Sequence, residues 1–548
     1  MVIESKLPLI QIPECSVIEF LFSNPFNIHS DKKILLDAIT GESLTFAQAK
    51  DSILRFATCL RERFNFKRGD VLAIYSPNQF DYSVPLLGAV AAGGSTSPAN
   101  PAYTPKELAY QLEMTKAKVL ITHTACLESA LEAADSVNLP RSHIFVFGKH
   151  IVNGIHPYSQ VFLSHTRCEG PVHLTSKEAK ETVAYLCFSS GTTGTSKGVM
   201  TTHSNIVSNV LQYYSIEQQF IKGAKDRMLG VLPFYHIFAL AICLHVAFYI
   251  GMPLYVVPKF DLITFCQIVQ QAKITYTCLV PPVILLLAKE PVIDQYDLSS
   301  LKIVVSGAAP LGADLSKQVR KRLPDTVFKQ GYGLTETSPV SIVEPTDNVI
   351  DGSTGILLPN MTAKIVDENG KEVRQGERGE VWLKGPNVMK GYLNNPKATA
   401  DCIDKDGYFH TGDVAYQDMH GHFYIVDRIK ELIKYKGFQV PPAELEALLL
   451  SSPLVADCAV IGIYDHEQAT ELPRAYIVVK PGISPSEETA RAIMRFITEQ
   501  VVYYKQLRSV RFIDAIPKSA SGKILRRVLR DAAAAEQKMQ QEKNKAKL

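Results

Sequence analysis

Short apolar runs rich in β-branched and aromatic residues alternate with longer amphipathic stretches through the first three-quarters of the chain. The short runs are typical of buried strands and the longer stretches of helices. Strands that alternate with helices predict an α/β fold with layered, largely parallel sheets, in which ligand sites follow the carboxyl ends of the strands. The predicted strands cover residues 71–75, 118–122, 184–188 and 302–306, and the predicted helices cover residues 45–63, 105–114 and 312–322.

The pattern changes twice in the last third of the chain. Beyond about residue 361, turns become frequent and short alternating strands follow, which predicts a small β-rich subdomain over about 361–427. Beyond Asp427, a mixture of helices and strands predicts a compact α+β domain. We therefore expect a large N-terminal domain over 1–427 and a small C-terminal domain over 428–548.

Residues 237–257 form an apolar stretch long enough to cross a bilayer. His245 interrupts it, and Gly251 with Pro253 breaks it. Because of these breaks, a buried helix, a turn and a short buried strand are favoured over a transmembrane helix.

Composition excludes several classes of protein. The chain of 548 residues is 46% hydrophobic and 21% charged, an ordinary globular balance with material for a large core. The net charge of +3 gives no indication of a nucleic-acid-binding protein. The ten cysteines are scattered without a C-x-x-C pair, so we expect reduced thiols rather than disulfides or zinc. The N-terminus lacks the pattern of a secretory signal.

Residues 189–198, SSGTTGTSKG, directly follow a predicted strand and precede a helix-forming stretch. The glycines allow backbone N–H groups to point inward, the hydroxyls add donors, and Lys197 adds positive charge. A flexible linker is the alternative, but its position between two regular elements favours a polyphosphate site. The glycine spacing is not that of a Walker loop. The candidate phosphate ligands are Ser189, Ser190, Gly191, Thr192, Thr193, Gly194 and Lys197.

This run resembles the signature of the adenylate-forming enzymes, which include acyl-CoA synthetases, 4-coumarate–CoA ligases, beetle luciferases and the adenylation domains of peptide synthetases. Further motifs of that family appear in order, and the resemblance covers nearly the whole chain. They are LPFYHIF (232–238), SGAAPLG (306–312), QGYGLTE (330–336), YFHTGD (408–413), DRIKELIKYKGFQ (427–439) and PKSASGKILRR (517–527).

The resemblance implies a nucleotide site. Tyr332 is expected to contact adenine, Thr335 a phosphate oxygen and Glu336 a Mg²⁺ ion, a hard cation that prefers carboxylate and phosphate oxygens. Asp413 is expected to accept both ribose hydroxyls, and Arg428 to touch the ribose. The other implied ATP or AMP contacts are Ala308, Gln330, Gly331, Lys430, Lys434, Gln439 and Lys523.

The resemblance also implies a reaction in two steps. Lys523 offsets the repulsion between the acid carboxylate and the α-phosphate while an acyl-adenylate forms. The C-terminal domain is then expected to turn about a hinge at Lys430, and coenzyme A attacks the adenylate. His236 is expected to gate between the steps. A satisfied core histidine and a charged surface hairpin are the plainer interpretations of His236 and of 427–439. The implied coenzyme A contacts are Lys259, Lys436 and Gly437.

The acid pocket departs from that of plant 4-coumarate–CoA ligases, to which the motifs are most similar. Those ligases commonly carry a lysine where this chain has Val305, and often a polar residue where it has Ala241. An apolar pocket offers no partner for a phenolic hydroxyl, so we expect a medium-chain fatty acid or an unsubstituted aryl acid such as phenylacetate or cinnamate. The implied pocket residues are Tyr235, Phe238, Ala241, Val305, Gly307, Gly331, Gly333, Pro339 and Val340.

Three other functions remain open. A luciferase-like monooxygenase shares every motif but is disfavoured, because it needs an oxygenation that the motifs do not encode. A peptide-synthetase adenylation module is disfavoured because no carrier domain follows Lys523. A degenerate scaffold is disfavoured by the intact Lys523, Glu336, Asp413 and Arg428. The final residues, Ala546-Lys547-Leu548, differ by one small residue from a peroxisomal address read by an import receptor. We therefore expect a peroxisomal location, and otherwise a cytoplasmic one.

Overall fold

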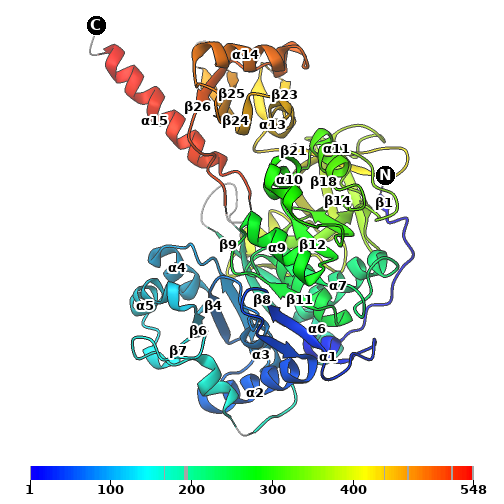
Figure 1. The fold of residues 1–548 in the computed structure, drawn as a ribbon, viewed down its shortest axis with the longest axis vertical. Coiled ribbons are helices and arrows are strands. Elements are labelled where there is room, and N and C mark those ends of the chain that lie inside the picture. The colour runs from blue at the N-terminus through cyan, green and yellow to red at the C-terminus, as the bar shows by residue number, and fades with distance from the viewer. Residues whose placement is uncertain are drawn as a thin grey trace.

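The computed structural model describes residues 2–165, 167–189, 196–436, 438–465, 468, 470–519 and 522–545. It contains a large N-terminal domain built on two wide sheets and a small sheet, and a smaller C-terminal domain at one end of the long axis (Figure 1). The predicted class, layered α/β with a small α+β C-terminal domain, is therefore confirmed. The candidate targeting tail, residues 546–548, lies outside the described residues, so the peroxisomal location stays a prediction.

The widest sheet has nine strands, and the six central ones, from β14 to β2 in the sheet order, are parallel. Their carboxyl ends therefore meet at one edge, where the loops after β13 and β14 carry predicted site residues. In order across the sheet, the strands are β16 (Ile356–Leu357), β15 (Val340–Val343), β14 (Val327–Gly333), β13 (Ile303–Ser306), β12 (Tyr276–Leu279), β10 (Met228–Gly230), β11 (Leu254–Val256), β2 (Lys33–Asp37) and β3 (Ser43–Thr45).

The second sheet has seven strands, of which five are parallel, whereas β8 and β9 pair antiparallel. The phosphate-loop candidate 189–198 thus spans the connection of an antiparallel pair. A helix does follow this run, but β9 comes first, because residues from Lys197 onward pair with β8 before α7 begins at His203. The order is β19 (Gly391–Tyr392), β9 (Lys197–Thr202), β8 (Val183–Ser189), β5 (Ser95–Ala99), β4 (Val71–Tyr75), β6 (Ala117–Thr122) and β7 (Ile144–Val146).

Helices cover these sheets, and side-chain caps fix where several of them begin. The threonines before α2, α4 and α7 each accept a hydrogen bond from the third helical N–H, and the residue at that position bonds back to the cap. The helices of the large domain are α1 (Val17–Phe22), α2 (Phe46–Phe64), α3 (Ser83–Ala91), α4 (Pro105–Thr115), α5 (Leu127–Ser136), α6 (Ser176–Glu181), α7 (His203–Glu217), α8 (Ala247–Ile250), α9 (Leu262–Ala272), α10 (Pro281–Lys289), α11 (Ala313–Arg322) and α12 (Pro396–Ala400). Single turns η1 (Thr124–Cys126), η2 (Arg141–His143), η5 (Pro291–Gln295) and η6 (Thr335–Thr337), and π-helices η3 (Ser159–Leu163) and η4 (Ala239–Val246), complete them.

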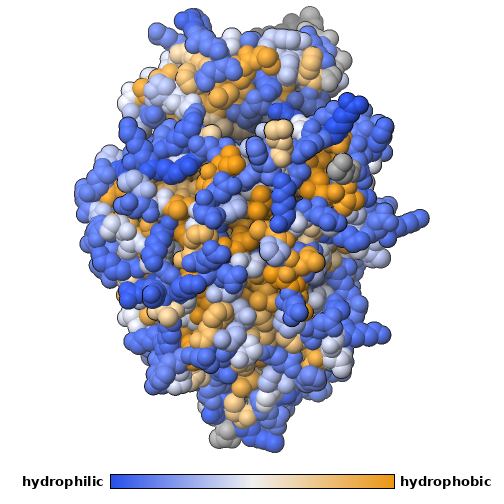
Figure 2. All heavy atoms as spheres, turned by 90° about the vertical axis from the view of Figure 1, so that its right-hand side faces the viewer, coloured by the Kyte–Doolittle hydropathy of each residue, from blue (hydrophilic) through white to orange (hydrophobic). Residues whose placement is uncertain are grey.

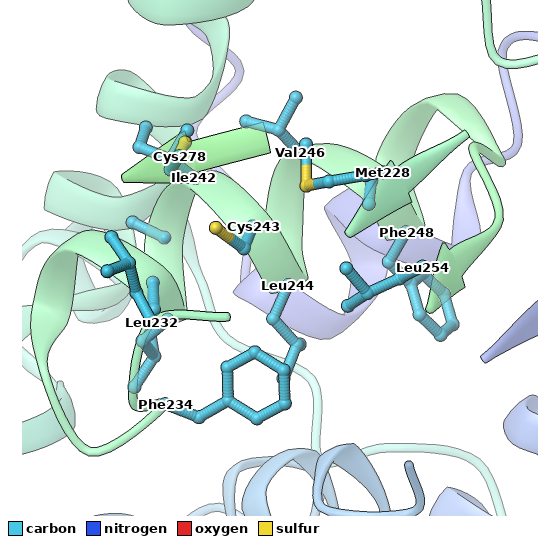
Figure 3. Packing of buried hydrophobic residues seen from close by; sticks show 14 of the residues in the cluster. Met228, Leu232, Phe234, Ile242, Cys243, Leu244, Val246, Phe248, Leu254 and Cys278 are labelled. Atoms are coloured by element: carbon cyan, nitrogen blue, oxygen red, sulfur yellow. The ribbon is translucent and has the colours of Figure 1, made fainter. Parts of the chain in front are cut away.

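The apolar stretch 237–257 is a buried helix, a turn and a strand, as predicted. η4 continues into α8, Gly251 ends it in the left-handed conformation with φ of 66°, and β11 follows. In Figure 3 the side chains of this stretch pack among those of β10, β11 and β12, with Cys243 facing Cys278. Among the described residues, no helix is both long and apolar enough to cross a membrane.

The β-rich subdomain is a five-stranded antiparallel sheet, and the N-terminus contributes an edge strand that the sequence pattern did not indicate. Its order is β1 (Ile3–Glu4), β17 (Thr362–Val366), β18 (Gly379–Lys384), β20 (Phe409–Gln417) and β21 (Phe423–Arg428). β21 ends at Arg428, so the predicted hinge residue Lys430 lies just beyond the sheet. Whether the chain turns there stays a prediction.

The C-terminal domain packs helices on a three-stranded sheet and a hairpin, around its own apolar core. Helix α15 leaves this body and extends outward (Figure 1). Hydrophilic side chains cover most of the face drawn in Figure 2, with apolar ones gathered near its centre. The elements are β22 (Ile433–Tyr435), β23 (Phe438–Val440), α13 (Pro442–Ser451), β24 (Val455–Asp465), β25 (Thr470–Val479), α14 (Glu487–Thr498), η7 (Tyr503–Lys505), β26 (Ser509–Phe512) and α15 (Arg526–Lys545).

Candidate active site

A cavity of about 1120 Å³ opens where the parallel strands of the two wide sheets end, and a loop of the C-terminal domain reaches into it. Sites for single small ligands span roughly 300–1,000 Å³, so this cavity has room for a nucleotide together with a second substrate. The predicted site residues that line it are Ser189, Lys197, Tyr235, His236, Phe238, Val305, Gly307, Ala308, Gly331, Tyr332, Gly333, Thr335, Glu336, Pro339, Val340, Arg428, Lys430 and Lys523.

Glu336 lies at the phosphate end of the cavity. One oxygen of its carboxylate accepts hydrogen bonds from Tyr392 Oη at 2.9 Å and from Ser189 Oγ at 3.3 Å. Lys197 Nζ lies 4.7 Å from the centre of the Tyr392 ring. A carboxylate and a cation therefore stand side by side next to the phosphate-loop candidate. Among the described residues, none donates a hydrogen bond to the second carboxylate oxygen, which suits a hard cation shared with phosphate oxygens.

Tyr332, Asp413 and Arg428 form a linked group, of which Tyr332 and Arg428 line the cavity. Tyr332 Oη donates to Asp413 Oδ2 at 2.6 Å, and Arg428 Nε lies 3.2 Å from Asp413 Oδ1. β20 and β21 set this contact, because Asp413 and Arg428 are paired neighbours in their register. Burial raises the pKa of Asp413, and the charge of Arg428 opposes that shift. The group presents an aromatic ring beside an oriented carboxylate, which is the pair a nucleoside requires.

Lys523 brings a cation from the C-terminal domain into this cavity. Burial, and then the charge of Arg428, lowers its pKa to about 8. The preceding Gly522 adopts φ of 76°, and a Cβ there would lie 3.0 Å from Val280 of the large domain. The same loop is anchored by Lys518 Nζ, 2.6 Å from Asp457 Oδ2. The loop thus holds Lys523 against the large domain.

His236 and Tyr235 place two unpaired polar atoms in the cavity wall. Their ring centres are 4.3 Å apart, and neither His236 Nε2 nor Tyr235 Oη has a hydrogen-bond partner in the part of the chain that the structure describes. Burial, and then the charge of Lys523, lowers the pKa of His236 to about 4, so the imidazole is neutral at pH 7. Buried polar groups are normally satisfied. These two atoms therefore await a ligand, which favours a functional role for His236 over a structural one.

The comparisons with known proteins agree with this geometry. Residues 25–393 match the family of AMP-binding enzymes, and residues 444–523 match the C-terminal domain of those enzymes. The chain belongs to the AMP-binding enzyme family.

Relatives of this AMP-binding enzyme extend over its whole length. A probable 4-coumarate–CoA ligase 1 of Dictyostelium discoideum is 39% identical over 96% of this chain and 97% of its own. The anthranilate–CoA ligase AuaEII in complex with anthranoyl-AMP has a TM-score of 0.84 at 26% identity, over 96% of this chain and 98% of that one. ATP-bound MatB from Rhodopseudomonas palustris has a TM-score of 0.83 at 27% identity, over 94% and 98%, whereas its apo form gives 0.73. The domain arrangement of the AMP-binding enzyme described here is thus more similar to the ATP-bound form.

Several predicted site residues do not line the cavity. Asp413 lies just behind its wall. Ala241 is completely buried in η4, and Ala239 lines the cavity in its place. The Gln330 side chain is engaged elsewhere, accepting from Leu311 N at 2.7 Å and donating to Ser353 O at 2.8 Å. Lys259, Lys434, Lys436 and Gln439 are exposed and away from the cavity. Ser190, Gly191, Thr192, Thr193, Gly194 and Gly437 lie outside the described residues.

The sequence missed three tyrosines that line the cavity, Tyr103, Tyr213 and Tyr392, and the last two have hydrogen-bond partners that are distant in sequence. Tyr392, which donates to Glu336, lies in the short strand β19 and belongs to none of the family motifs. Tyr213 of α7 also lines the cavity, and its apolar surroundings in sequence indicated only a buried helix face. Both positions depend on contacts with residues more than 50 positions away, which periodicity does not reveal.

Proposed function

We propose that this AMP-binding enzyme is an ATP-dependent acid–CoA ligase. It forms an acyl-adenylate and pyrophosphate from a carboxylic acid and ATP, and then an acyl-CoA thioester and AMP. One observation carries the proposal: Lys523 of the C-terminal domain lines the same cavity as Glu336, Thr335, Tyr332 and Arg428. Asp413, which contacts both Tyr332 and Arg428, lies directly behind this wall. The relatives named as CoA ligases support the same reaction.

In the first step, the acid carboxylate attacks the α-phosphate of ATP and pyrophosphate leaves. Asp413 accepts from the ribose hydroxyls, and the Tyr332 ring packs on adenine. Glu336 and the phosphate oxygens would hold Mg²⁺, which neutralises charge on the leaving pyrophosphate. Lys523 stabilises the charge that develops between carboxylate and phosphate.

In the second step, the thiolate of coenzyme A attacks the adenylate carbonyl and AMP leaves. The C-terminal domain has to move first, because Lys523 occupies the cavity in the arrangement described here. A turn about Lys430 withdraws Lys523 and brings Lys436 and Gly437 towards the thiol of coenzyme A. The exposure of Lys434, Lys436 and Gln439 fits this account, since they await the second arrangement.

For the acid, we propose an apolar substrate, either an unsubstituted aryl acid or a medium-chain fatty acid. The described part of the acid-pocket wall consists largely of Phe238, Val305, Pro339 and Val340, with glycines between them. A Cβ on Gly307 would lie 2.8 Å from Phe238, so the pocket is narrow where the acid lies. A clear preference for 4-coumarate over both cinnamate and hexanoate would contradict this part.

The test is pyrophosphate release with a panel of acids, with and without coenzyme A, in the wild type and in Lys523→Ala. We expect acid-dependent release in the wild type, thioester only with coenzyme A, and at least a hundredfold slower adenylation in Lys523→Ala. Lys371→Ala, in an exposed turn of the subdomain, is the matched control. Adenylation by Lys523→Ala at the wild-type rate would contradict the role of Lys523. Light emission with luciferin would favour a luciferase instead.

A further inference from the structure

Three side chains of α7 face the wide sheet at intervals of four residues, which places them on one stripe of the helix. Asn209 Nδ2 donates to Val340 O at 2.6 Å. Tyr213 Oη shares a hydrogen bond with Tyr276 Oη of β12. Glu217 forms an ion pair with Lys329 of β14. Tyr213 therefore lies between a contact at the cavity wall and a charged pair in the core.

Strand register locates the two tyrosine hydroxyls relative to the acid pocket. Cys278 pairs with Val305, and Tyr276 lies two residues earlier on the same strand. Side chains alternate along a strand, so Tyr276 shares the face of Cys278 and Val305 but lies farther from the carboxyl ends. Val305 lines the cavity. The pair of hydroxyls thus lies beyond Val305, at the inner end of the pocket.

This inner end is closed. Tyr213 and Tyr276 are each 0% exposed, and Val305 is 1% exposed. Tyr213 nevertheless borders the cavity, and among the described residues no other member of α7 does. Burial raises the pKa of both tyrosines well above its ordinary value, so both hydroxyls stay neutral. Behind them lies the completely buried pair of Lys329 and Glu217, which Thr346 also contacts.

An apolar acid cannot extend past this point at low cost. To do so it would displace the Tyr213 ring, leave the Tyr276 hydroxyl unpaired and approach a buried ion pair. The ring is held from both sides, by Tyr276 at its hydroxyl and by the anchored helix at its backbone. A well-packed interior of this kind resists local movement.

We propose that Tyr213 forms the floor of the acid pocket and restricts this enzyme to compact apolar acids, meaning single-ring aryl acids and fatty acids of medium length or shorter. This inference rests on the proposed ligase function and adds the residue that sets the limit. The limit on the size of the acid is steric and comes from the Tyr213 ring, because the Tyr213 hydroxyl is already hydrogen-bonded to Tyr276.

The experiment compares kcat/KM for adenylation of cinnamate and of saturated fatty acids from butanoate to hexadecanoate. The variants are Tyr213→Ala, which removes the ring, and Tyr213→Phe, which keeps the ring and removes the hydroxyl. We expect the wild type and Tyr213→Phe to share one cut-off in chain length. Tyr213→Ala should accept longer acids, with the ratio of long-chain to short-chain kcat/KM raised at least about tenfold. Tyr213→Leu, which leaves a smaller cavity, provides an intermediate step if Tyr213→Ala does not fold.

The outcomes separate this inference from the proposed function. If a folded Tyr213→Ala or Tyr213→Leu still adenylates the short acids with an unchanged cut-off in chain length, Tyr213 is not the floor of the acid pocket, and the ligase function stands. If Tyr213→Phe moves the cut-off as far as Tyr213→Leu, the hydroxyl sets the limit and the steric account is wrong. If the wild type adenylates none of the acids, the proposed function itself fails. A wild-type enzyme that prefers hexadecanoate would directly contradict the proposal that Tyr213 limits the length of the acid.

Discussion

Two basic side chains of the site, Lys523 and His236, carry pKa values lowered mainly by burial. The consequences differ. His236, with a pKa of about 4, stays neutral through the physiological range and can donate or accept a hydrogen bond without a charge. Lys523, with a pKa of about 8, is protonated at pH 7 but is close to losing its proton. The cation that the first step needs is therefore the group most sensitive to a rise in pH.

We expect kcat/KM of the adenylation step to fall as the pH rises through about 8, because the free enzyme then loses the charge on Lys523. Below that pH the lysine is protonated, and His236 contributes no change near pH 6.5. Pyrophosphate release between pH 6 and 10 measures the profile. Lys523→Arg is the matched variant, since arginine keeps its charge and should lose the alkaline decline. A wild-type profile that stays flat to pH 10 would contradict this assignment.

A second prediction concerns the hydrogen bond from Tyr332 to Asp413. Tyr332→Phe keeps the ring against adenine but leaves the buried carboxylate with one partner fewer. Hydrogen bonds to charged groups contribute about 1.5–3 kcal/mol, so we expect KM for ATP to rise about 10- to 100-fold, with KM for the acid little changed. Steady-state kinetics against both substrates measures this split.

Tyr424→Phe is the control for this change, because Tyr424 donates to Asp418 at 3.2 Å on the same small sheet but does not line the cavity. Equal losses in both variants would mean that the sheet, and not the nucleotide contact, was damaged.

Among residues, motif spacing predicted the charged groups better than the tyrosines. Glu336, Arg428 and Lys523 lie in short motifs whose order alone indicated a shared site, and the structure brings them to one cavity. Tyr213 gave no such signal. Its partner Tyr276 is 63 positions away, and only the register of β12 against β13 shows that their contact closes the pocket.

At the scale of elements, alternation of apolar runs and amphipathic stretches was enough to find the main strands and helices to within one or two residues. It failed at β9, because a short strand after the phosphate-loop candidate looks like the start of the helix that follows. It also failed at β1, whose two residues are strand only because β17 offers a free edge. The strand missed at β9 pairs with its sequence neighbour β8, whereas Ile3 of β1 pairs with the distant Ala363.

The loop between β13 and α11 supplies a prediction about the acid. Gly307 lies directly against Phe238, so Gly307→Ala must push the ring into the pocket or move the backbone. We expect kcat/KM for the acid to fall at least about tenfold while KM for ATP changes little. Gly170→Ala, where a Cβ meets nothing within 4 Å, is the control. Thermal unfolding of both variants should match the wild type to within a few degrees. If kcat/KM for the acid is unchanged in Gly307→Ala, the acid does not bind beside Gly307 and Phe238.

At the scale of the whole molecule, the two domains meet at the site in an arrangement suited to one half of the reaction. Lys289 Nζ donates to Leu450 O at 3.0 Å, and Gly312 lies against Ala447 of α13. Together with Lys523 in the cavity, these contacts hold the C-terminal domain where the adenylate forms. The higher similarity to ATP-bound MatB than to its apo form agrees with this assignment.

Locking this arrangement should separate the two steps. A Cβ on Gly312 would lie 3.2 Å from Ala447 Cβ, slightly closer than in an ordinary disulfide, so Gly312→Cys with Ala447→Cys can be bridged after a small shift. Gly312 has φ of −60°, which a cysteine adopts without strain. We expect the oxidised double variant to release pyrophosphate in a first turnover but to form thioester at least about a hundredfold more slowly, since Lys523 cannot withdraw. Reduction should restore the second step.

Each single cysteine variant, oxidised in the same way, controls for the ten native thiols, of which Cys168 is exposed. Adenylate retained on the oxidised enzyme would be measured by quenching and chromatography, which distinguishes a block after adenylation from a general loss of activity. If the oxidised double variant makes thioester at the wild-type rate, no large turn of the C-terminal domain is needed, and Lys436 and Gly437 then have no part in guiding the thiol. If it fails already in the first step, the bridge has distorted the site, and the single variants show whether the bridge or the substitutions caused the loss.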